Sequence, residues 1–180
     1  MKQKIHEEIE IPEGVELEVE ENFVKVKGPE GVNSKEINFW RVNVEKKDGK
    51  VVLGNPKATK KEKKVMKTIA GHIRNLIKGV QEKFKYQLKV CSTHFPMSVS
   101  VDNGKVTIKN FWGEKIPRET TVPEGAEVSV DGEYITVKSI DKETAGKTAA
   151  SLEAATKIRN RDTRVFQDGI YIINKAGKEI

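Results

Sequence analysis

The chain has 180 residues, of which 36% are hydrophobic and 33% are charged, and its formal net charge is +6. This length and composition suit one or two small domains with modest cores. No apolar run approaches the roughly 20 residues of a membrane helix, residues 1–14 contain no apolar signal core, and the single cysteine, Cys91, excludes an internal disulfide framework. We therefore expect a cytoplasmic protein without a membrane partner.

Two stretches follow one plan, Ile11–Gly28 and, 111 positions later, Val122–Ser139. Each begins with a Pro-Glu-Gly turn, in which proline presets the backbone dihedral and glycine closes the turn. Alternating apolar and polar residues then predict two half-buried strands separated by a polar break. Each copy is therefore predicted to form a β-hairpin, and Asp131-Gly132 is the stronger of the two turn patterns.

The first copy continues with a further strand pair and a helix. The pair is expected at Ile37–Val44 and Val51–Leu53, joined through Lys47–Lys50. The helix is predicted over about Ala58–Val80, because apolar residues recur there at helical spacing. This apolar stripe consists of Val65, Ile69, Ile73, Leu76, Ile77 and Val80.

A strand over Lys83–Val90 opens the second half of the chain. Its alternation predicts one apolar face and one basic face. The apolar face consists of Phe84, Tyr86, Leu88 and Val90, and the basic face of Lys83, Lys85, Lys89 and Gln87. A second helix is expected to start near Asp141, which suits an N-cap. The residues predicted to share one face of that helix are Ala145, Ala149, Leu152 and Thr156.

These elements predict an α+β fold. We expect two tandem copies of an antiparallel sheet with one packed helix, arising from an internal duplication and followed by a basic C-terminal tail. The expected boundaries are residues 1–81, 82–158 and 159–180.

Positive charge is concentrated in two regions. Residues 58–89 carry ten basic and two acidic side chains, a local charge of +8, and residues 159–180 carry five and three. Arrays of lysine and arginine neutralise phosphates and release counterions, so nucleic-acid binding is the leading partner hypothesis. For the run Lys60–Lys64, a solvated helix face is an equally good interpretation.

Three arginines, Arg159, Arg161 and Arg164, follow the end of the second predicted helix. The planar fork of arginine suits phosphates and guanine edges. Interaction with the negative end of the helix dipole would explain Arg159 alone, but it would not explain both Arg161 and Arg164. The segment is therefore the second candidate for nucleic-acid binding.

Patterns typical of enzymes and metal sites are incomplete. Ala145–Thr148 is similar to the tail of a phosphate-binding loop, but Asp141 stands where that loop requires a glycine. Cys91 and His94 have the spacing of a zinc-ligand pair without a second pair nearby, and His72 flanks the apolar stripe as a half-buried structural histidine would. We expect no catalysis, no cofactor, no metal and no small-molecule substrate.

Several long motifs occur along the chain in one order. They are GHIRNLIKGV (Gly71–Val80), FKYQLKV (Phe84–Val90), THFPMSV (Thr93–Val99), NFWGEK (Asn110–Lys115), VKSIDKETAGKTAA (Val137–Ala150) and RVFQDGIY (Arg164–Tyr171). With these motifs, the chain resembles the large-subunit ribosomal protein six family, in its archaeal and eukaryotic branch, over nearly its whole length. A duplicated α+β unit is itself a feature of that family.

The resemblance implies a structural constituent of the large ribosomal subunit. It implies a ribosomal RNA partner near the sarcin-ricin loop and the stalk base, neighbouring ribosomal proteins at the stalk base, and translation factors nearby. The alternative is a non-ribosomal RNA-binding module, whose binding would not favour the sarcin-ricin region.

In this family the carboxyl-terminal half supplies the main RNA anchor. Carried onto this chain, the resemblance points to Lys109, Asn110, Phe111, Trp112, Gly113, Lys115, Arg118, Arg159, Asn160, Arg161 and Arg164. By their chemistry, Lys109 and Lys115 are expected to reach phosphates, and Gly113 to let backbone approach RNA closely. Possible secondary contacts are Lys60, Lys61, Lys63, Lys64, Lys83, Lys85 and Lys89.

Two roles stay open for Trp112, which can stack on an unpaired base or anchor its loop to its own sheet. Bacterial members carry a Pro-rich Lys-Gly-Lys-Gly tail, so their RNA contacts are not transferred to residues 159–169. In this tail Asp162 and Asp168 are expected to organise arginines. In the first copy, the strand face of Glu16, Glu18 and Glu20 is expected to contact protein.

Overall fold

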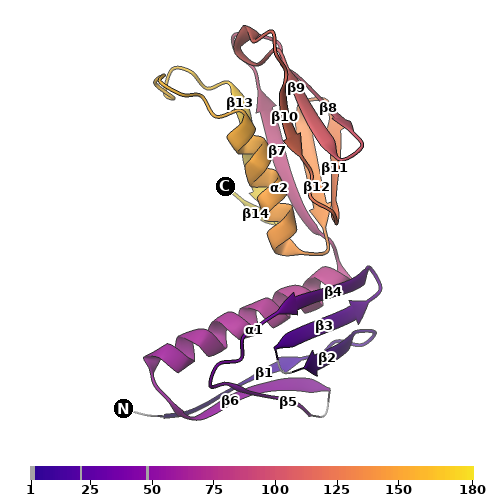
Figure 1. Cartoon of the computed structure of the whole chain (residues 1–180), viewed down its shortest axis with the longest axis vertical. Coiled ribbons are helices and arrows are strands. Elements are labelled where there is room, and N and C mark those ends of the chain that lie inside the picture. The colour runs from indigo at the N-terminus through magenta and orange to yellow at the C-terminus, as the bar shows by residue number, and fades with distance from the viewer. Residues whose placement is uncertain (1–2, 21, 48) are drawn as a thin grey trace. The chain divides into compact units, whose positions relative to one another are not determined.

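The computed structural model describes residues 3–20, 22–47 and 49–180, and the chain divides into two compact units between Lys83 and Phe84. Each unit combines antiparallel strands with one long helix (Figure 1). The fold class is therefore α+β, as predicted. Residues 159–180, expected as a tail, lie within the second unit.

Unit 1 contains two three-stranded antiparallel sheets and the helix α1. The first sheet has the order β1 (Gln3–Glu10), β6 (Lys50–Ala58), β5 (Asn43–Lys47), and the second has the order β2 (Glu16–Glu20), β3 (Phe23–Gly28), β4 (Gly31–Glu36). Helix α1 (Lys60–Gln81) contacts strands of both sheets. The predicted hairpin of the first copy is β2–β3, so that prediction is confirmed.

Helix α1 begins two residues later than predicted, because Ala58 ends β6 and Thr59 caps the helix. The N–H of Lys61 donates to Thr59 Oγ1 (3.3 Å), and Glu62 accepts from the N–H of Thr59 (2.9 Å), which forms a capping box. The hydrogen bond from the Thr59 side chain, followed by those from backbone N–H groups, lowers the pKa of Glu62 to about 2. The predicted stripe is buried apart from Val65, which is half-buried.

The predicted strand Ile37–Val44 is wrong over residues 37–42. There the N–H of Val42 donates to the carbonyl of Phe39 (2.8 Å), Arg41 has φ 54°, and β5 begins only at Asn43. The segment resembled a strand by composition, because it is rich in β-branched and aromatic residues. The predicted connection Lys47–Lys50 includes residue 48, which lies outside the described residues.

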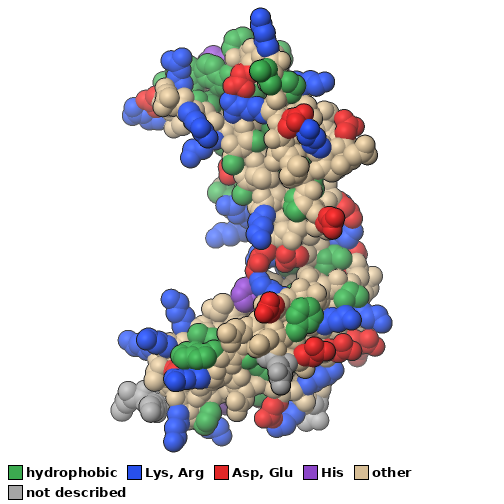
Figure 2. Space-filling model, viewed as in Figure 1, with side chains coloured by type: hydrophobic (Ala, Val, Ile, Leu, Met, Phe, Trp, Pro, Cys, Tyr) green, Lys and Arg blue, Asp and Glu red, His purple; other side chains and the backbone are tan. Residues whose placement is uncertain are grey.

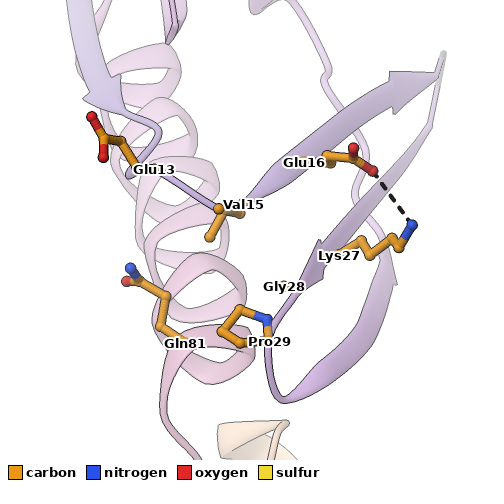
Figure 3. A pocket seen from close by; sticks show the side chains of 8 residues that line it. Glu13, Val15, Glu16, Lys27, Gly28, Pro29 and Gln81 are labelled. Carbon is orange, nitrogen blue, oxygen red and sulfur yellow. Dashed lines mark ion pairs between the residues drawn. The ribbon is translucent and has the colours of Figure 1, made fainter.

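Glycine is required where the β3–β4 connection meets the end of α1 (Figure 3). A Cβ at Gly28 would lie 2.8 Å from Val80 Cγ2 and 2.9 Å from the Val80 carbonyl oxygen. The N–H of Glu30 also donates to that carbonyl (2.9 Å). This close backbone approach joins the second sheet to the helix.

Unit 2 contains a five-stranded and a three-stranded antiparallel sheet with the helix α2. The larger sheet has the order β11 (Ala126–Asp131), β12 (Tyr134–Ser139), β7 (Phe84–Cys91), β13 (Gly169–Lys175), β14 (Lys178–Glu179), and the smaller has the order β10 (Arg118–Thr121), β9 (Lys105–Lys109), β8 (Ser98–Asp102). Helix α2 (Lys142–Ala155) contacts β7, β12 and β13. The predicted second hairpin is β11–β12.

The predicted apolar face of β7 and the small-residue face of α2 are confirmed, except that Thr156 is the C-cap of α2. Lys83, predicted for the basic face, precedes β7. Phe84, Tyr86, Leu88 and Val90 are buried in one core with Ala145, Ala149 and Leu152. Asp141 caps α2 by accepting from the N–H of Thr144 (2.9 Å) and, more weakly, from that of Glu143 (3.2 Å). The small side chains of α2 allow it to lie close to the sheet. Among the described residues, no helix is long and apolar enough to cross a membrane.

Candidate nucleic-acid interface

Three loops of unit 2 converge on a cluster of three rings. The loops are residues 92–97 after β7, 110–117 between β9 and β10, and 156–168 between α2 and β13. The ring of Trp112 stacks on His94 with centroids 5.3 Å apart and meets Phe166 edge-on at 5.0 Å, while His94 and Phe166 lie 5.7 Å apart. We call His94, Trp112 and Phe166 the three-ring cluster. It joins the two segments that the sequence predicted separately, NFWGEK and the arginine-rich segment.

Asp168 holds two of these loops together from a buried position, with only 5% of the residue exposed. Its carboxylate accepts hydrogen bonds from the N–H groups of Thr93 (2.6 Å) and His94 (2.9 Å), and from His94 Nδ1 (2.5 Å). Burial by itself raises the pKa of Asp168, but these hydrogen bonds outweigh it and the pKa is lowered. We call this arrangement the Asp168 clasp.

The expected role of Asp168 in organising arginines is wrong, because its carboxylate binds the 93–94 loop instead. Asp162 does organise an arginine, since it pairs with Arg164 Nη2 at 2.7 Å. Sequence reasoning missed His94 and Phe166 as parts of the site. Both belong to family motifs, THFPMSV and RVFQDGIY, and an aromatic ring within each motif was the signal that could have found them.

A short 3₁₀ turn, η1 (Phe111–Gly113), carries Trp112 into the cluster. Asn110, Trp112 and Gly113 all have left-handed φ values, of 59°, 56° and 72°. This backbone is unfavourable for a tryptophan, so the ring contacts and the hydrogen bond from Asn110 Nδ2 to the carbonyl of Pro96 (2.9 Å) must hold it. Trp112 is half-buried and therefore anchors its loop. Its stacking on a base stays a prediction.

Arg118 is engaged within the chain. Its Nε and Nη2 donate to the carboxylate of Glu114 (2.8 and 2.6 Å), its Nη1 donates to the carbonyl of Ala155 (2.8 Å), and its guanidinium lies 4.3 Å from the centroid of Phe111. The hydrogen bonds from Arg118 lower the pKa of Glu114 against the opposing effect of burial. Arg118 thus ties the 110–117 loop to the end of α2, and its direct contact with RNA stays a prediction.

Phe111, also predicted for the anchor, is instead buried in the core of unit 2. The other residues predicted for the anchor are exposed to solvent. They are Lys109, Asn110, Gly113, Lys115, Arg159, Asn160, Arg161 and Arg164. Arg161 places its guanidinium 5.7 Å from the centroid of Phe166. The Arg164 side chain is 88% exposed even though it pairs with Asp162, so this pair is weak and can open to a phosphate.

A groove of about 430 Å³ lies between the 110–117 loop and the segment after α2. Phe111 and Trp112 line one part of it, and Lys157, Arg159 and Arg161 line another. Aromatic walls beside cationic side chains provide the two contacts that an unpaired nucleotide needs, a surface for its base and charge for its phosphate.

The possible secondary contacts lie elsewhere. Lys60, Lys61, Lys63 and Lys64 occupy the first turns of α1 in unit 1, where all four are exposed. Lys85 and Lys89 lie within the five-stranded sheet. Lys85 lies opposite Lys138 in the β7–β12 register, and Lys89 Nζ lies 6.0 Å from the ring centroid of Tyr134. Among the described residues, the structure has no group of three histidines, cysteines or carboxylates that could hold a metal.

The strand face expected to contact protein carries both signs of charge. Glu16 forms an ion pair with Lys27 (3.6 Å, Figure 3), and Glu18 lies opposite Lys25 in the β2–β3 register. The face is therefore not acidic as a whole. Contact with protein through this face stays a prediction.

Comparison with known proteins assigns the chain to a family. The family described as Ribosomal protein L6 matches the chain over residues 11–83 and 95–169, one segment in each unit. The chain belongs to the ribosomal protein L6 family. The two matches confirm the internal duplication that the hairpins predicted.

Similar curated members of the L6 family come from archaea, as the predicted branch implies. The large ribosomal subunit protein uL6 of Methanobrevibacter smithii is 47% identical over 171 residues, which cover 95% of this chain and 96% of the relative. That of Archaeoglobus fulgidus is 46% identical over 179 residues (96% and 91%), and that of Methanococcus vannielii is 45% identical over 174 residues (97% and 96%). These relatives are named as ribosomal proteins and not as enzymes.

Proposed function

We propose that this protein is a structural constituent of the large ribosomal subunit and anchors to ribosomal RNA through the loop end of unit 2. The observation that carries this proposal is the convergence of the three-ring cluster, the groove and the exposed basic residues in one place. Membership of the L6 family supports the ribosomal partner. From the family resemblance we place the RNA site near the sarcin-ricin loop and the stalk base, where neighbouring ribosomal proteins lie and translation factors dock.

The interface is organised before RNA arrives. The Asp168 clasp holds the 92–97 loop, and Arg118 holds the 110–117 loop against the end of α2. Because these loops need little ordering on binding, more of the contact energy contributes to affinity. The exposed side chains of Lys109, Lys115 and Arg161 then contact phosphates, and the groove receives an unpaired base.

Binding to a large-subunit RNA fragment that contains the sarcin-ricin region tests the proposal, against a scrambled RNA of equal length and across a salt series. Arg159→Ala/Arg161→Ala should bind the native fragment more weakly. Its salt dependence should become shallower by about 0.7–0.9 in log–log slope for each phosphate that the variant no longer neutralises. A matched control is Lys138→Ala/Lys147→Ala, which removes the same charge from exposed positions away from the groove.

The outcomes separate the proposal from its alternative. Preference for the native fragment, with a smaller slope only in the arginine variant, supports anchoring by this surface. Equal affinity for both RNAs would instead favour a non-ribosomal RNA-binding module. Equal slopes for the two double variants would contradict a role for Arg159 and Arg161.

A further inference from the structure

Unit 1 exposes a tryptophan on a turn where smaller residues are favoured. Trp40 and Arg41 occupy the central positions of the β-turn Phe39–Val42, which the N–H of Val42 closes by donating to the Phe39 carbonyl (2.8 Å). Arg41 has φ 54°, a conformation that glycine or asparagine adopts at lower cost. Trp40 is nevertheless 46% exposed. Folding alone does not explain the exposed Trp40 ring.

The turn is held rigidly by its neighbours. Asn55 Nδ2 donates to the carbonyl of Arg41 (2.6 Å), and Arg41 Nη1 donates to Glu62 Oε1 (3.3 Å) at the start of α1. The Arg41 guanidinium lies 4.6 Å from the Trp40 ring centroid. The ring is therefore restrained before any partner binds, which lowers the entropy cost of stacking on it.

A groove of about 320 Å³ begins beside this turn. Ile37, Val65 and Ile69 form its apolar lining. Its charged lining consists of Lys35, Lys64 and one carboxylate, Glu36. Its volume lies at the low end of the range of about 300–1,000 Å³ for small-ligand pockets, which suits a single nucleotide. Its apolar floor can contact a base, and Lys64 at its edge can contact a phosphate.

The charge around the turn is strongly positive. Residues 57–64 contain five lysines and one acid, Glu62, which is already engaged by Arg41 and Thr59. Figure 2 shows a hydrophobic patch on unit 1 with Lys and Arg side chains gathered around it. An exposed aromatic ring beside several cations matches the composition of surfaces that bind single-stranded nucleic acid. This charge favours RNA over a protein partner.

We propose that unit 1 has a second RNA site, in which an unpaired base stacks on Trp40, an adjacent nucleotide enters the groove, and the lysines of residues 57–64 contact the phosphates. The site rests on the proposed function, because the RNA is taken to be the same ribosomal RNA. It extends that function by assigning a direct RNA contact to the first copy of the duplication.

Tryptophan fluorescence tests the site in the full chain, which contains two tryptophans. Trp112→Phe leaves Trp40 as the only one. Titration of this chain with the large-subunit RNA fragment should quench its emission, while the anisotropy of the labelled RNA reports binding in the same sample. The companion Trp40→Phe chain measures how much of the change belongs to Trp112.

Affinity gives a second measurement. Trp40→Ala in the otherwise native chain should weaken binding by about 5- to 150-fold, the range for loss of one stacked base, and Lys64→Ala should weaken it less. Matched controls are Phe23→Ala, which removes another exposed ring of unit 1, and Lys25→Ala, which removes a lysine from the same strand. Both controls should bind like the native chain.

The two proposals fail in different ways. RNA binding without quenching of Trp40, together with unchanged affinity of Trp40→Ala, would overturn the second site and leave the unit 2 anchor standing. It would also favour a protein partner for this turn. If the Arg159→Ala/Arg161→Ala variant binds normally but Trp40→Ala does not, the second site stands and the anchor is wrong. Failure of the native chain to bind RNA would overturn both.

Discussion

Replacement of Asp168 by alanine should destabilise unit 2 without affecting unit 1. The substitution removes the acceptor for the backbone N–H groups of Thr93 and His94 and for the His94 ring. Unsatisfied donors cost about 1–3 kcal/mol each, and water can reach part of this exposed loop, so we expect a loss of about 2–3 kcal/mol in the free energy of unfolding. The three-ring cluster loses its support at the same time.

Urea unfolding measures this loss in the Trp40→Phe background, where Trp112 emission reports on unit 2 alone. With an m-value of about 1–3 kcal/mol/M, the midpoint should fall by roughly 0.7–3 M. Asp162→Ala is the matched control, because it removes an equally charged side chain from the same loop at an exposed position, and it should leave the midpoint in place. Equal midpoints for the Trp40→Phe chain with and without Asp168→Ala would refute the stabilising role of the Asp168 clasp.

The pH dependence gives an independent check of the same reasoning. The pKa of Asp168 is lowered from 3.8 in the folded protein, so its stabilisation is fully present above about pH 4 and is lost as the pH falls through the folded pKa. Asp168→Asn should therefore be less stable than the native chain at neutral pH. The difference between them should shrink steadily below pH 4, and a difference that stays constant to pH 2 would contradict the ionised clasp.

Two further predictions concern unit 1. Gly28→Ala should destabilise it by about 1–3 kcal/mol, because the new Cβ meets the backbone and side chain of Val80. Gly71→Ala, which has open space on α1, should stabilise it by about 0.5–1 kcal/mol. Thermal unfolding should therefore show a lower Tm for the first variant and a higher Tm for the second. Glu62→Gln should remove the acid-dependent part of unit 1 stability, which the native chain keeps above pH 4.5 and loses between pH 4.5 and about 2. Amide hydrogen exchange along α1 measures that difference, and identical pH profiles would contradict the capping box as its source.

Local patterns predicted both helices, both hairpins and strand β7. Both hairpins, the buried stripe of α1 and the small-residue face of α2 depend on residues near one another in sequence, so alternation, helical spacing and capping residues were sufficient. The turn at Phe39–Val42 was not predicted, because β-branched and aromatic residues dominate this segment and resemble a strand by composition. The strands that were not predicted are β1, β4, β8, β9, β10, β13 and β14. In β1 and β4 the apolar alternation is interrupted by charged and polar residues.

The sequence by itself determined the family, the α+β class, the duplication and the two basic segments, because motifs and charge are properties of the chain order. It did not show that Asp168 binds the 93–94 loop, that Arg118 is engaged by Glu114 and Ala155, or that the ring of Trp112 contacts both His94 and Phe166. His94 and Asp168 are 74 residues apart. Only tertiary structure decides such contacts, because pairing β13 beside β7 brings the ends of distant loops together and selects which charged groups bind one another and which stay exposed to a partner.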